Sequence, residues 1–87
     1  MRAERKDVED AIGKLSGGKE LVYKLAETFG GEFAHIVLNK DAKGGKYSIV
    51  LEEADEDKPT GKKSVFMSTD KVPFIAKWIN DMWGEPV

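Results

Sequence analysis

Three stretches in the second half of the chain alternate apolar and polar side chains with a period of two. They read EFAHIVLN, KYSIVLEE and SVFMS and begin at Glu32, Lys46 and Ser64. Such alternation is the pattern of a strand with one buried face. The linker KDAKGG suits a hairpin with glycine at positive φ, and the longer ADEDKPTGK suits a wider loop. The sequence therefore predicts an antiparallel sheet of three to four strands.

Helical periodicity marks both ends of the chain. Residues 3–15 carry one apolar stripe, and residues 21–29 carry a second that Gly30 and Gly31 end. Near the C-terminus, Pro73 suits a first helical turn, which Ser68, Thr69 or Asp70 would cap. The apolar face of this amphipathic helix comprises Phe74, Ile75, Trp78, Ile79 and Met82. We expect one α+β domain over residues 1–87 in the order α-α-β-β-β-α, with a helical segment over 1–30 and sheet plus helix over 32–83.

The alternation also assigns side chains to two faces of the expected sheet. One face packs on the terminal helix and comprises Ile36, Leu38, Ile49, Leu51, Val65 and Met67. The other points away from it and comprises Phe33, His35, Val37, Val50 and Phe66. The second face is too apolar to be wholly wet. The N-terminal helices, a second subunit or a ligand would cover it.

Composition excludes several classes of function but does not identify one. Eighty-seven residues suffice for one small domain. A domain of this size is only marginally stable alone, and dimerisation would stabilise it. The start MRAERKDVED lacks an apolar stretch, so we expect a cytoplasmic protein, and no run is long enough to span a membrane. Without cysteine there is no disulfide or thiolate site. The absence of glutamine beside thirty charged residues resembles thermophile composition.

Candidate catalytic and cofactor motifs are weak. The stretch GKLSGGKEL approaches a phosphate-binding loop, but Glu20 stands where that loop needs Ser or Thr for magnesium, and a helix precedes it. The only histidine, His35, has no recognisable catalytic or metal-binding partners. The acidic run EEADED lacks calcium-loop spacing and suits a solvated loop. We therefore expect no enzyme, cofactor or metal.

Basic residues gather around the expected turns. One group lies at the first hairpin, a second precedes the third strand, and two aromatic residues lie on strands nearby. Lysines that contact phosphates beside aromatics that stack on bases are the usual chemistry of single-strand binding, although charged loops around a core look similar. The candidate residues are Lys40, Lys43, Lys46, Tyr47, Lys62, Lys63 and Phe66.

The stretch from Gly44 to Ile79 resembles the C-terminal domain of the transcriptional coactivator positive cofactor four. The resemblance spans roughly residues 33–82. It rests on the Lys-Gly-Gly-Lys hairpin, the strand with Ile49 and Leu51, the Lys-Pro loop before a basic pair, the small polar cap and the amphipathic helix. Pur-alpha-type repeats share this sheet-then-helix plan.

The resemblance implies a homodimer with a curved antiparallel sheet that binds single-stranded DNA or RNA without catalysis. Lys43, Lys46, Lys62 and Lys63 would contact phosphates, and Phe66 would stack on a base. The helix residues Phe74, Trp78, Ile79 and Met82 would pack the sheet and the dimer partner. The family has four strands where three are expected here, and its minimal domain lacks the N-terminal helices. The alternative is a protein-interaction or regulatory module, which Trp83 at the rim of the helix favours.

Overall fold

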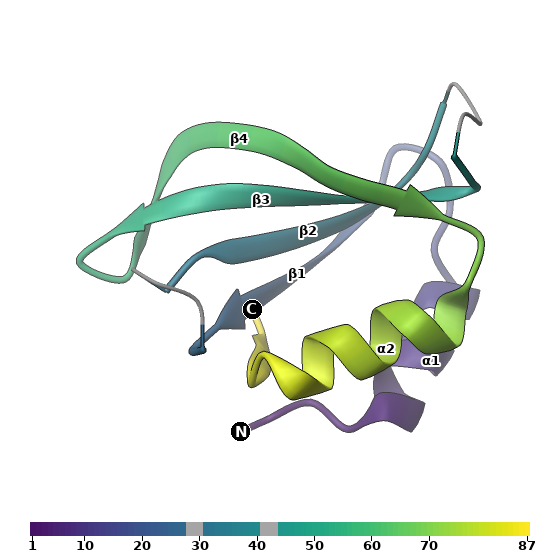
Figure 1. The fold of residues 1–87 in the computed structure, drawn as a ribbon, viewed down its shortest axis with the longest axis horizontal. Coiled ribbons are helices and arrows are strands. Elements are labelled where there is room, and N and C mark those ends of the chain that lie inside the picture. Colours follow the sequence, from purple (N-terminus) through teal and green to yellow (C-terminus); the bar gives the residue numbers. More distant parts are fainter. Residues whose placement is uncertain (28–30, 41–43) are drawn as a thin grey trace.

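The fold is a five-stranded antiparallel sheet with two helices on one of its faces (Figure 1). The computed structural model describes residues 1–27, 31–40 and 44–87. The strands follow the spatial order β4-β3-β2-β1-β5. The elements are α1 (Arg5–Gly13), β1 (Glu20–Leu25), β2 (Phe33–Leu38), β3 (Tyr47–Asp55), β4 (Lys58–Thr69), α2 (Val72–Asp81) and β5 (Gly84–Pro86).

The expected order α-α-β-β-β-α is wrong, because the second helix is a strand. Leu21, Val22 and Leu25 fit a helical stripe, but β1 pairs with β2 from Glu20 to Lys24. Its alternate residues Tyr23 and Leu25 are buried in the core. The energy of completing the sheet therefore overrides a local helical pattern. Residues 28–30 of the expected helix lie outside the described residues.

A short strand at the C-terminus also departs from the expectation. Gly84 and Pro86 were expected only to end the last helix, whereas β5 pairs antiparallel with Tyr23–Leu25 of β1. The first and last helices are confirmed as α1 and α2. The expected cap of α2 is not formed: Lys71 occupies the N-cap, and the Asp70 carboxylate instead accepts the backbone N–H of Lys46 at 2.5 Å.

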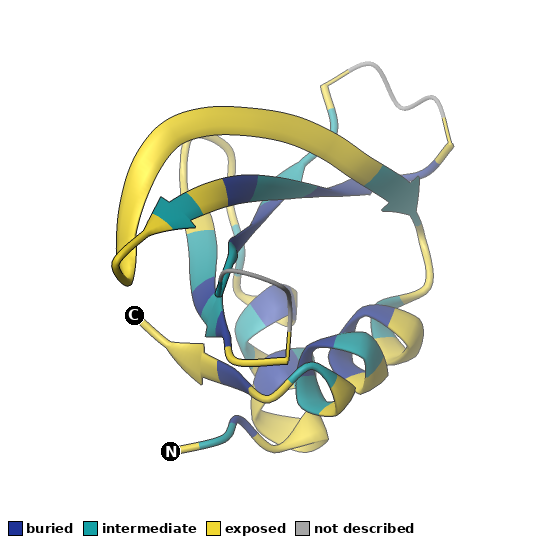
Figure 2. Ribbon diagram, turned by 60° about the vertical axis from the view of Figure 1, so that its left-hand side comes forward, coloured by how far each residue is buried: buried dark blue, intermediate teal, exposed yellow. Residues whose placement is uncertain are grey.

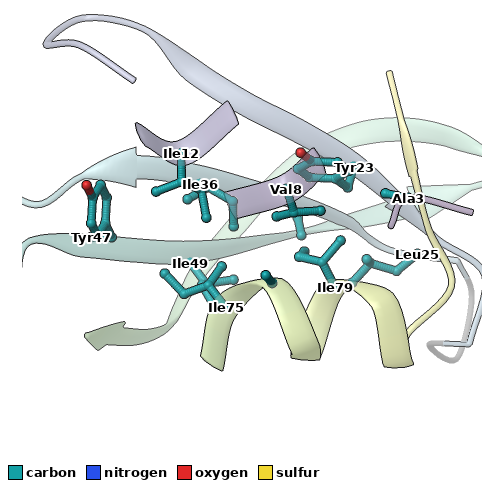
Figure 3. Packing of buried hydrophobic residues seen from close by; sticks show 12 residues of the cluster. Ala3, Val8, Ile12, Tyr23, Leu25, Ile36, Tyr47, Ile49, Ile75 and Ile79 are labelled. Carbon is teal, nitrogen blue, oxygen red and sulfur yellow. The ribbon is translucent and has the colours of Figure 1, made fainter. Parts of the chain in front are cut away.

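The core lies between the sheet and both helices, as Figure 3 shows. Ile36 of β2 lies opposite Ile49 of β3, and both are completely buried, as expected for the helix-facing side. The helices contribute four more completely buried residues, Val8, Ile12, Ile75 and Ile79, and β1 contributes Leu25. Because α1 and α2 share one face, α1 does not cover the second face of the sheet.

A bulge in β4 overturns two side-chain assignments. Met67 pairs with Ile49, but Val65, two residues earlier, pairs with the very next residue, Val50. Phe66 is thus the extra residue of a β-bulge, which re-aims a side chain. Its ring lies against Trp78 of α2, so the expectation that Phe66 points away from the helix is wrong. Val65, expected to face the helix, shares the opposite face with Val50 and is 67% exposed.

Candidate nucleic-acid interface

Three aromatic side chains form a partly exposed strip where β4 approaches α2. The Phe66 and Trp78 rings stack with centroids 5.2 Å apart and an interplanar angle of 26°. Phe74 precedes Trp78 by one helical turn, so the two lie on the same side of α2. Phe66 and Phe74 are 49% and 43% exposed. We call Phe66, Phe74 and Trp78 the aromatic strip; part of each exposed ring remains available to a flat, apolar ligand.

The basic residues of β4 divide between the two faces of the sheet. Lys63 lies opposite Glu52, on the face that lacks helices. Ser64 lies opposite Leu51, which packs against the core, so alternation places Lys62 on the helix side with Phe66. Both lysines are exposed. Lys62 therefore lies on the same side of the sheet as the aromatic strip, and Lys63 lies on the other side.

The candidates of the first hairpin lie at the end of β4 opposite to Lys62 and Lys63, beside the connection from β4 to α2. Lys40 and Lys46 flank this hairpin, which the N–H of Asn39 closes on the Lys46 carbonyl at 2.7 Å. The Lys46 ammonium lies 5.5 Å from the centre of the Tyr47 ring. Tyr47 itself belongs to the core and is only 7% exposed, so it offers no stacking surface to a base. Lys43 lies outside the described residues.

The helix residues expected to pack against the sheet and a dimer partner differ in how far they are buried. Ile79 is completely buried in the core, and Trp78 and Met82 are partly buried against it. Phe74 remains largely outside. Trp83 is 46% exposed, and the Arg2 guanidinium lies over its ring at 4.3 Å. Arg2 in turn donates to the Asn80 carbonyl and side chain at 2.8 and 3.1 Å. The Trp83 ring is therefore an anchor for the N-terminal segment.

A buried histidine–carboxylate pair was missed by the sequence reasoning. His35 and Glu52 are 7% and 6% exposed on the face that lacks helices. The His35 Nε2 atom lies 2.7 Å from a Glu52 carboxylate oxygen. Its Nδ1 atom lies 3.2 Å from a Glu20 carboxylate oxygen, but the alignment does not make a hydrogen bond. Glu52 was expected in a solvated acidic loop; pairing of the two strands instead sets it diagonally across from His35.

Contacts around Glu52 hold the pKa of its carboxyl below the ordinary value. The hydrogen bond from His35 is the largest cause, followed among the favourable ones by the backbone N–H of Gly61 and by the charges of His35 and Lys63. Burial opposes them. Gly61 lies in β4, and its N–H donates to Glu52 at 2.8 Å. One carboxylate thus connects β2, β3 and β4.

Stability is expected to fall when Glu52 is protonated. Because its folded pKa is depressed, its contribution is present above the unfolded value of about 4.3 and is lost as pH falls through the folded value. Glu52→Gln should lower the Tm at pH 7, and its difference from the native chain should shrink at more acidic pH. Thermal unfolding followed by circular dichroism from pH 7 to pH 2 measures this. Glu53→Gln, at an exposed neighbour, is the control; equal pH profiles for the two variants would contradict the assignment.

The described part of the chain offers little for other chemistry. No three of its His, Asp and Glu side chains are grouped to hold a metal ion. Among the helices of residues 1–27, 31–40 and 44–87, none has the length and apolar character needed to cross a bilayer.

Comparisons with known proteins found no match: no family model, no curated protein and no solved structure is significantly similar to this chain.

Proposed function

We propose that this chain is a non-enzymatic, cytoplasmic single-stranded nucleic-acid-binding protein whose contact surface is the aromatic strip. The stacked pair of Phe66, which is 49% exposed, and Trp78, which is partly buried, carries the proposal. Aromatic side chains on a surface give sequence-tolerant stacking of bases, worth about 1–3 kcal/mol per base. The buried position of Tyr47 shifts the proposed stacking site from the first hairpin to the aromatic strip.

The element order adds support. Four consecutive antiparallel strands precede α2. This matches the four strands of the positive cofactor four family better than the three expected from the sequence. α1 and β5 are additions to that plan, and neither is part of the aromatic strip.

Electrostatics favour weak, salt-sensitive binding at this surface. Lys62 is exposed on the same side as Phe66, and Lys71 is exposed at the start of α2. Lys77 already pairs with Asp81 at 2.6 Å. The net charge of the whole chain is −2, so attraction of phosphates must be local. We expect binding to be measurable at low salt and to weaken steeply as salt is added.

Titration of a fluorescein-labelled oligothymidine of twelve nucleotides, followed by anisotropy at low salt, tests the proposal. Phe66→Ala should weaken binding about 5- to 150-fold, the equivalent of one lost stacking contact. Val65→Ala is the matched control, because Val65 is the adjacent, exposed residue on the other face. Equal effects of the two substitutions, or no anisotropy change with the native chain, would refute the proposal.

The salt dependence of oligonucleotide binding distinguishes the role of Lys62 from that of Lys63. Lys62→Ala should reduce the slope of log K against log salt by about 0.7, the value for one phosphate contact on a single strand. Lys63→Ala, on the opposite face, should leave that slope unchanged. Sedimentation of the same samples reports whether a homodimer is the binding species, as the family resemblance implies.

A further inference from the structure

The edge of the sheet opposite β4 is only partly paired. β5 lies against Tyr23, Lys24 and Leu25 of β1, and the N–H of Val87 donates to the Val22 carbonyl at 3.1 Å. Beyond that point, Glu20 and Leu21 have no neighbouring strand on this side in the described part of the chain. Unpaired strand edges are templates for the backbone of another segment.

A cavity of about 600 Å³ lies along this same stretch of β1. Its walls come from α1, the first three residues, β1 and the end of β5. Apolar side chains make most of the lining, and they include Ala3, Ala11, Leu21, Val22, Tyr23 and Pro86. The unpaired backbone and the cavity are thus two features of one slot, open at the sheet edge.

Two carboxylates lie at the slot, one on α1 and one on β1. Asp7 and Glu20 line it, and both are exposed. The pKa of Tyr23, which also lines the slot, is raised first by burial and then by the negative charge of Asp7. Two cations also line the slot: the Arg2 guanidinium donates to the uncharged Asn80, and the N-terminal amine pairs with Glu85 at 3.3 Å.

We propose that this slot binds an extended peptide with two successive basic residues, which adds to β1 in line with β5. Such β-augmentation obtains affinity from main-chain hydrogen bonds and specificity from pockets for alternate side chains. The slot lies at the β1 edge, whereas the aromatic strip lies at the β4 edge, so this activity is independent of nucleic-acid binding.

The register of β1 specifies where the two basic residues lie. A peptide residue opposite Leu21 shares its helix-facing side and points into the cavity, toward Asp7. The next residue lies opposite Glu20, on the other face, where cross-strand opposite charges are favourable. An acidic residue at either position would face a carboxylate. The slot therefore selects a basic pair over an acidic pair.

The probe is the blocked hexapeptide Thr-Val-Lys-Lys-Val-Thr, titrated into the full chain labelled with ¹⁵N. Backbone amide shifts at Glu20, Leu21 and Val22 should move, with a dissociation constant of about 0.1–1 mM for so small an interface. The peptide Thr-Val-Glu-Glu-Val-Thr should bind at least about threefold more weakly because of like-charge contacts. A copy of the basic peptide with methylated backbone amides at the lysines should lose binding, because it cannot donate to the edge.

Two exposed carboxylates supply the variants. Asp7→Asn and Glu20→Gln should each weaken binding of the basic peptide about two- to fivefold, the range of exposed ion pairs. Glu9→Gln, on the same helix as Asp7 but outside the cavity lining, should bind like the native chain. Shifts spread over both faces of the protein, equal binding of the acidic peptide, or no shift at about 2 mM peptide would overturn the proposal. A dimer that forms without peptide and shifts the amides of Glu20, Leu21 and Val22 on dilution would show that two copies pair through their β1 edges, and it would overturn the proposal as well.

Discussion

Gly45→Ala is expected to lower the free energy of unfolding by about 3 kcal/mol or more. A Cβ atom at this position would lie 2.3 Å from the Thr69 carbonyl carbon and 2.5 Å from the Asp70 nitrogen. Both are backbone atoms, which cannot move aside without shifting the connection from β4 to α2. Gly45 also has φ 137°, a conformation that side chains rarely adopt. Steric overlap and backbone strain therefore add.

Thermal unfolding of the variant should show a Tm lower by about 10–25 °C, given the size of the domain. Gly17→Ala is the control, because no atom lies within 4 Å of the Cβ it would add. That variant should unfold within a few degrees of the native chain. If both substitutions had the same small effect, the close approach of the β2–β3 hairpin to the end of β4 would be wrong.

Ile36→Ala should cost about 2–5 kcal/mol, the range for truncation of a fully buried branched side chain. Ile36 is completely buried at the centre of the sheet, opposite Leu21 on β1 and Ile49 on β3. Truncation leaves a cavity that three strands and both helices must either tolerate or close. In a domain of ordinary stability this is a large fraction of the total.

Val37→Ala is the matched control, one residue further along the same strand. It is only partly buried and lies on the face without helices. Its cost should be well below that of Ile36→Ala, which urea unfolding at 25 °C measures directly. A larger cost at position 37 would mean that β2 is shifted by one residue, since such a shift exchanges the faces of all its side chains.

The sequence predicted correctly those elements whose apolar pattern fits only a helix or only a strand. α2 has a broad apolar face and an early proline, and β2 and β3 alternate clearly. β1 was missed because Leu21, Val22 and Leu25 satisfy a helical stripe as well as a strand. The choice between them depends on pairing with β2, which is tertiary information. β5 was missed because its glycine and proline are also helix terminators.

The sequence predicted several residues of the candidate site but not how their side chains are arranged. Lys62 and Phe66 do share one side of the molecule, but Trp78 had been assigned to packing and Tyr47 to stacking. The bulge at Phe66 leaves no signature in the alternation of SVFMS, so its side chain was placed on the wrong face. Burial of Glu52 likewise depends on which residue of β2 lies beside it, and an acidic run gives no hint of that.

The outer strand of the sheet has a consequence for solubility. Within the described residues no strand pairs with the outer side of β4, which is exposed along most of its twelve residues (Figure 2). Long free strands of this kind invite edge-to-edge polymerisation. Pro59 cannot donate to a neighbouring chain, Lys62 and Lys63 repel copies of themselves, and two register shifts make the strand irregular. The bulge that turns Phe66 toward Trp78 therefore also helps keep the protein from aggregating.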